Sequence, residues 1–96
     1  MAKHTEKEGS EYVLKLFVSG ATSNSIKAID NLRQILETYM TTTYNLEIID
    51  VRQSPELAQE EQLIALPLLI KKQPLPERKL LGNMSNIQKV REGLGI

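Results

Sequence analysis

Few side chains in this sequence are suited to covalent or redox chemistry. The 96 residues contain no cysteine and one histidine, His4. Without a thiol there can be no disulfide, no thiolate nucleophile, no iron–sulfur cluster and no thiol-ligated zinc. One histidine cannot build a metal site by itself. We therefore expect neither a cofactor nor a bound metal.

The hydroxyls and carboxylates do not form a recognisable catalytic set either. The segment 22–25 reads Thr-Ser-Asn-Ser, and we expect Thr22 to cap a helix there, an anion site at the same helix start being the alternative. A serine nucleophile needs a base within hydrogen-bond reach, and His4 in the polar N-terminal segment is a poor candidate. Glu60 and Glu61 are neighbours on a predicted helix, so their side chains diverge by about 100° and cannot face each other as an acid–base pair. The sequence therefore predicts a protein that is not an enzyme.

Charge argues against a polyanion as the ligand. Twelve basic and twelve acidic residues cancel, so no overall field attracts nucleic acid or an anionic membrane. The balance is uneven along the chain, because residues 71–96 hold six basic and two acidic residues whereas residues 1–70 hold six and ten. Such an asymmetry favours oriented docking on a charged protein partner, and two solvated surfaces are the alternative.

The chain length permits one domain, because about 100 residues bury a single small core. Residues 1–10 are polar and lack an apolar periodicity, so we expect a flexible tail followed by one domain over residues 11–96. No segment approaches 18 uninterrupted apolar residues, and no apolar leader precedes the domain. We expect a cytoplasmic protein.

Apolar periodicity predicts the order strand, helix, strand, helix, strand, strand, helix. The expected strands are residues 12–18, 44–51, 66–70 and 79–81, and the expected helices are residues 23–40, 56–64 and 86–92. In the first helix the buried stripe is expected to include Ile26, Ile29, Leu36 and Met40. In the second helix Leu57 and Ile64, with Leu63, are expected to face the core.

This order has a geometric consequence. A strand–helix–strand opening implies a parallel pair with a right-handed crossover, and the two later strands with a short turn imply a hairpin. The result is an α/β fold with the thioredoxin-like layout βαβαββα and a four-stranded mixed sheet. Strand 12–18 is apolar on both faces and belongs inside the sheet, whereas strand 44–51 carries polar residues and belongs at an edge. Pro67, just before the third strand, is expected to follow a cis peptide bond.

Several stretches together resemble the KaiB family of circadian-clock proteins, over roughly residues 12–94. They are Tyr12-Val13-Leu14-Lys15-Leu16-Phe17-Val18-Ser19-Gly20, Asn24-Ser25-Ile26-Lys27-Ala28, Ile48-Ile49-Asp50-Val51, Pro55-Glu56-Leu57-Ala58, Ile64-Ala65-Leu66-Pro67 and Leu81-Gly82. Each stretch alone is weakly specific. Their order and spacing run through the predicted domain without a large gap.

The resemblance implies a non-enzymatic clock protein that binds a KaiC-like ATPase ring and modulates its phosphorylation or timing cycle. The family's basic contact residues fall on Lys27 and on Arg78 or Lys79, and a further family lysine is replaced by Gln62. The edge strand that pairs with a KaiA-like protein falls on residues 44–51. The edge residues expected to bind a partner are Tyr44, Leu46, Glu47, Ile48, Ile49 and Asp50.

The resemblance also implies that two folds are accessible to this chain. Family members have a self-associated ground state, dimeric or tetrameric, with the order βαββααβ, and a thioredoxin-like state that binds the ATPase. The chain departs from the family at Ser23, Leu66 and Leu75, and we expect mainly the thioredoxin-like state. The alternative function is a thioredoxin-like interaction module without redox activity, serving stress response or signalling with a partner such as a sensor kinase.

Overall fold

The computed structural model describes residues 11–62 and 65–96, so the predicted tail over residues 1–10 lies outside the described residues. The elements follow one another as predicted, with an α/β order and not the alternative βαββααβ. They are β1 (Tyr12–Val18), α1 (Ser23–Tyr39), β2 (Tyr44–Asp50), α2 (Pro55–Glu60), β3 (Leu68–Gln73), β4 (Arg78–Leu81) and α3 (Ile87–Leu94). None of the helices described is long and apolar enough to cross a membrane.

The strands form a mixed sheet in the order β2-β1-β3-β4. β1 pairs in parallel with β2 along its whole length, from Tyr12 opposite Tyr44 to Val18 opposite Asp50, and antiparallel with β3. β3 in turn pairs antiparallel with β4. The predicted placement is confirmed: β1 is central because it is apolar on both faces, and β2 lies at an edge.

Helix α1 begins where the sequence predicts it. The Thr22 side chain accepts a hydrogen bond from the Ser25 N–H at 3.2 Å, which is the expected N-cap. The residues that α1 buries are Ser25, Ala28, Leu32, Ile35 and Leu36. Ile26 does not belong to the buried stripe, since 49% of it is exposed. It lies one position beyond Ser25, which turns its side chain about 100° away from the sheet.

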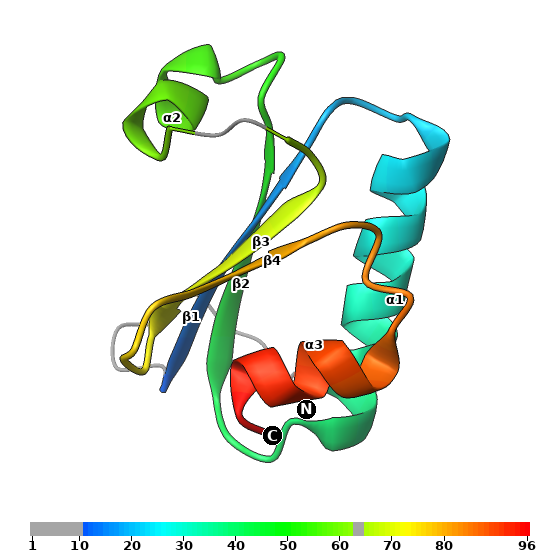
Figure 1. Cartoon of the computed structure of the whole chain (residues 1–96), viewed down its shortest axis with the longest axis vertical. Coiled ribbons are helices and arrows are strands. Elements are labelled where there is room, and N and C mark those ends of the chain that lie inside the picture. Colours follow the sequence, from blue (N-terminus) through cyan, green and yellow to red (C-terminus); the bar gives the residue numbers. More distant parts are fainter. Residues whose placement is uncertain (1–10, 63–64) are drawn as a thin grey trace.

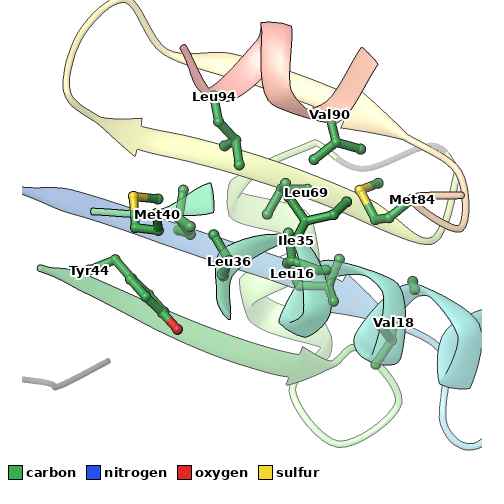
Figure 2. Packing of buried hydrophobic residues seen from close by; sticks show 13 residues of the cluster. Leu16, Val18, Ile35, Leu36, Met40, Tyr44, Leu69, Met84, Val90 and Leu94 are labelled. Atoms are coloured by element: carbon green, nitrogen blue, oxygen red, sulfur yellow. The ribbon is translucent and has the colours of Figure 1, made fainter. Parts of the chain in front are cut away.

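Most of the core lies between the sheet and the two helices α1 and α3, which cover the same face (Figure 1). Figure 2 shows Leu16 and Leu69 of the sheet, Ile35 and Leu36 of α1, and Val90 and Leu94 of α3 meeting in this layer. A smaller cluster of Phe17, Ile49 and Ile70 occupies the opposite face. Among the described elements, α2 alone lies on that face, at one end of the sheet (Figure 1).

Helix α2 is shorter than the predicted 56–64. It ends at Glu60, and Gln62 has a positive φ of 55°, a conformation outside the helix. Leu57 packs partly on the smaller cluster, but α2 buries none of its residues completely. Ser54 makes no side-chain cap bond, and Pro55 opens the helix. The predicted core positions Leu63 and Ile64 lie outside the described residues.

The C-terminal elements match the predicted types with shifted boundaries. β3 starts at Leu68 and not at the predicted residue 66, because Pro67 has no N–H for the ladder, and it continues to Gln73. The peptide bond between Leu66 and Pro67 is cis, as expected. The Asn86 side chain accepts from the Lys89 N–H at 3.1 Å and caps α3. α3 continues past Glu92 to Leu94, and Gly95 ends it with φ 77°.

Candidate functional site

The outer edge of β2 is the first candidate docking surface. Within the described residues β2 pairs only with β1. Its residues alternate between the two faces: Tyr44, Leu46 and Ile48 pack toward α1 and α3, whereas Ile49 packs into the smaller cluster. Glu47 is the exposed side chain of the strand. The edge therefore offers a partner mainly its backbone and the Glu47 carboxylate.

Tyr44 contributes to the fold through its ring. It is buried beside Met40 and Leu36, at the end of β2 that Figure 2 shows. Burial raises the pKa of the Tyr44 hydroxyl, the nearby Glu37 adds to the effect and Arg33 opposes it. At neutral pH Tyr44 is an uncharged anchor that fixes the start of β2 on the core.

Asp50 at the other end of β2 ties two loops together. Its carboxylate accepts hydrogen bonds from the Gly20 N–H and the Arg52 N–H, both at 3.0 Å, and its Oδ1 lies 3.7 Å from the Arg52 Nε. The backbone bond from Arg52, then that from Gly20, holds the pKa of Asp50 below its ordinary value. The main work of this side chain is to join the loop after β1 to the loop after β2.

The basic residues expected to contact a partner are exposed, but the structure does not gather them into one patch. Lys27 lies in the first turns of α1, and Figure 1 places that end of α1 and the turn before Arg78 at opposite ends of the molecule. Arg78 and Lys79 are adjacent in β4, so their side chains point to opposite faces of the sheet. Gln62 is exposed just after α2.

Two lysines of β3 are less available to a binding partner than their place in the basic C-terminal segment indicates. Lys71 is buried, and its desolvation, with the nearby charge of Arg78, lowers its pKa. The Lys72 Nζ donates to Glu61 Oε2 at 2.9 Å and lies 3.7 Å from Glu77 Oε1. The bond to Glu61 is the main reason why the pKa of Lys72 is raised. This ion pair fastens the end of α2 to β3.

A hollow of about 430 Å³ lies where a thioredoxin-like fold often places its chemistry, at the start of α1 beside Pro67. Two of its hydroxyls, those of Thr22 and Ser25, are engaged with each other. Thr22 Oγ1 is 2.8 Å from Ser25 Oγ, which accepts from the Ser19 N–H at 3.1 Å and donates to the Ser19 carbonyl at 3.4 Å. In the part of the chain that is described, no group of three His, Cys, Asp or Glu residues could hold a metal ion. The hydroxyls of Thr22 and Ser25 thus close the loop after β1 onto the start of α1.

Comparison with known proteins gives a consistent family. The model of the KaiB domain matches residues 15–96. A circadian clock oscillator protein KaiB of a Picosynechococcus species is 47% identical over 85 residues, which cover 88% of this chain and 82% of that protein. The protein of the same name from Synechococcus elongatus is 44% identical over 85 residues, covering 88% and 83%.

Solved structures agree on the fold. The N-terminal domain of Synechococcus elongatus SasA superposes with a TM-score of 0.73 at 21% identity and covers 99% of this chain and 93% of its own. Mitochondrial thioredoxin 3 of Saccharomyces cerevisiae superposes with a TM-score of 0.72 at 17% identity, covering 91% and 79%. The predicted thioredoxin-like fold is thereby confirmed.

Proposed function

Because this chain belongs to the KaiB family, we propose that it is a non-enzymatic clock protein that docks on a KaiC-like ATPase ring and modulates its phosphorylation or timing cycle. Its relatives carry the name circadian clock oscillator protein, which supports a clock role. The observation that carries the proposal is family membership over most of the chain. It is joined by a β2 edge that no other described strand covers and by a sequence without a thiol.

Charge supports docking in two places. Lys27 on α1 and Lys79 on β4 are exposed. The start of α1 and the turn that precedes β4 lie at opposite ends of the molecule (Figure 1), so a ring that contacts both elements must present a broad acidic surface. Exposed charges of this kind chiefly accelerate and orient association, and salt weakens their effect. Gln62, where the resemblance puts a lysine, removes one such charge.

The β2 edge supports a second partner. Backbone groups on an exposed edge accept an added strand, and the buried Tyr44 and Ile49 keep that edge in a fixed position. We propose that a KaiA-like protein, or the sensor kinase of the alternative reading, adds a strand there once the chain is on the ring. We further propose that the chain acts in the cytoplasm and self-associates as a dimer or tetramer in its ground state.

Binding to a purified KaiC-like hexamer tests the ring proposal. The wild-type chain should bind at low salt and more weakly at raised salt, and Lys27→Glu and Lys79→Glu should each slow association by about tenfold. Arg33→Glu is the matched control, since it reverses an exposed charge farther along α1. A folded wild-type chain that does not bind at low salt would contradict the proposal and favour an interaction module in stress response or signalling.

A further inference from the structure

The described part of the sheet has a second open edge, on the side opposite β2. Among the described residues β4 pairs only with β3. The Gly82 N–H donates to the Pro67 carbonyl at 2.9 Å, which makes these two residues a hydrogen-bonded pair at the end of the β3–β4 register. Hydrogen-bonded and non-bonded pairs alternate in an antiparallel ladder. The backbone N–H and C=O groups of Leu81 and Lys79 therefore point away from β3, toward the open edge.

A groove of about 420 Å³ runs beside this edge, between β4, the loop that follows it and the start of α3. Its apolar wall is formed by Leu80, Leu81, Met84 and Val90, and its charged residues are Lys79 and Lys89. Leu81 is 63% exposed, although it is a large aliphatic side chain. Gly82 leaves the approach open, because a Cβ added there would meet no atom within 4 Å.

The charged residues that line the groove, Lys79 and Lys89, have one sign. Residues 78–91 contain four basic residues and no acidic residue. Arg91 is engaged with α1, where its guanidinium lies 4.0 Å from the centroid of the Tyr39 ring. Arg78, Lys79 and Lys89 are exposed at or near the groove. Edge-to-edge pairing of two β4 strands would bring these cations of both copies together, so the charge favours an acidic occupant over a second β4.

We propose that the β4 edge and its groove bind an extended acidic peptide segment of another protein, which adds to the sheet as a strand beside β4. The segment pairs its backbone with Lys79 and Leu81. Because side chains alternate along a strand, its aliphatic side chains lie against Leu81 on one face of the sheet, and its carboxylates lie on the other face, beside Lys89 of α3. This site is distinct from the β2 edge, so one molecule can hold a strand on each side of its sheet.

The test uses a labelled peptide of about ten alternating glutamate and valine residues, with fluorescence anisotropy as the readout on the full chain. The acidic peptide should bind, and a lysine–valine peptide of the same length should not. The double variant Lys79→Glu with Lys89→Glu should weaken binding by about tenfold or more. The double variant Lys27→Glu with Arg33→Glu, which reverses two charges away from the groove, should bind as the wild type does.

A proline variant separates strand addition from simple charge attraction. Leu81→Pro removes an outward N–H while leaving the β3–β4 ladder intact, and proline is tolerated on edge strands. It should remain folded by circular dichroism and lose the peptide. Wild-type affinity in folded Leu81→Pro would overturn the proposal, as would failure of the acidic peptide to bind the wild-type chain.

The location of binding is checked by amide chemical shifts. Addition of the peptide should shift the amides of residues 78–90, and shifts confined to residues 44–50 would overturn the proposal. Sedimentation of the free chain tests whether a second copy of the chain occupies the β4 edge instead. Assembly that grows with concentration and is abolished by Leu81→Pro would show that a second copy fills this edge and would overturn the proposal. The peptide and the KaiC-like hexamer are separate probes, so failure with one does not decide the other.

Discussion

Ile49 allows the structural and docking roles of β2 to be measured separately. It is 5% exposed and packs with Phe17 and Ile70 beneath α2, whereas Glu47 on the same face of the same strand is exposed. Ile49→Val removes one buried methylene group, and such changes cost about 0.5–1.5 kcal/mol of unfolding free energy; Ile49→Ala costs about 2–5 kcal/mol. Glu47→Gln is the matched surface control and should change stability by less than about 0.5 kcal/mol.

The expected loss of unfolding free energy can be narrowed for the Ile49 variants. The cluster around Ile49 is small and is covered by a single short helix, so it can relax around a cavity, and we expect the lower half of each range. For a domain of this size a loss of 1 kcal/mol lowers Tm by about 4–8 °C. Ile49→Val should therefore lower Tm by about 5 °C, and Ile49→Ala by at least about 10 °C.

Urea and thermal unfolding followed by far-ultraviolet circular dichroism provide the assay, with an unchanged m-value as the sign that only stability has moved. Binding of the KaiA-like protein proposed for the β2 edge is then measured well below the Tm of each variant. Ile49→Val should bind as the wild type does, because its side chain faces the core. An Ile49→Val variant as stable as Glu47→Gln would show that Ile49 is not a core residue, and loss of the partner by fully folded Ile49→Val would show that its side chain takes part in docking.

Three further perturbations follow from individual contacts. In Asp50→Asn, Tm should fall less steeply than in the wild type as the solution is made acidic. The lowered pKa of Asp50 contributes stability that is present above its ordinary value of 3.8 and is lost as pH falls through the lower folded value. An equally steep fall of Tm in the variant would count against this. Lys72→Met should lower the free energy of unfolding by under about 1 kcal/mol, as expected for a partly exposed pair with Glu61. Because the pKa of Lys72 is raised, the wild type should lose this contribution as the pH rises above 10.5, and the variant should show no such loss in urea titrations at a series of pH values. Gly20→Ala should lower the free energy of unfolding, measured by urea titration, by about 1–2 kcal/mol, because Gly20 has φ 60°, a conformation that strains any residue with a Cβ. A neutral effect would show that this loop conformation is not required.

The arrangement of the strands could be predicted from the sequence alone. Tyr12–Val18 is apolar at both sets of alternating positions, and this pattern alone places it in the interior of a sheet. The short spacing between β3 and β4 predicts a hairpin, and the long helix before β2 predicts a parallel crossover. These inferences depend on period and connection length, which are local properties of a sequence.

The side-chain environment of the candidate site depends on contacts between segments, and the sequence did not reveal it. Lys71 and Lys72 look alike in a basic segment, yet one is buried and the other is paired with Glu61 from a different element. Asp50 looks like a charged edge residue, but its carboxylate is occupied by backbone N–H groups of two loops. Ile26 fits a helical stripe until the true centre of the buried face, near Leu32, is known.

The zero net charge of the chain conceals two edges of opposite character. The exposed side chain of β2 is the carboxylate of Glu47, whereas β4 exposes Arg78 and Lys79. Like charges placed opposite each other destabilise a strand pair, so each edge rejects an incoming strand of its own sign. Two edges that accept strands of opposite charge can be filled by different partners without competition. Raised salt should weaken this selectivity at both edges, because screening acts on exposed charges and spares the backbone hydrogen bonds.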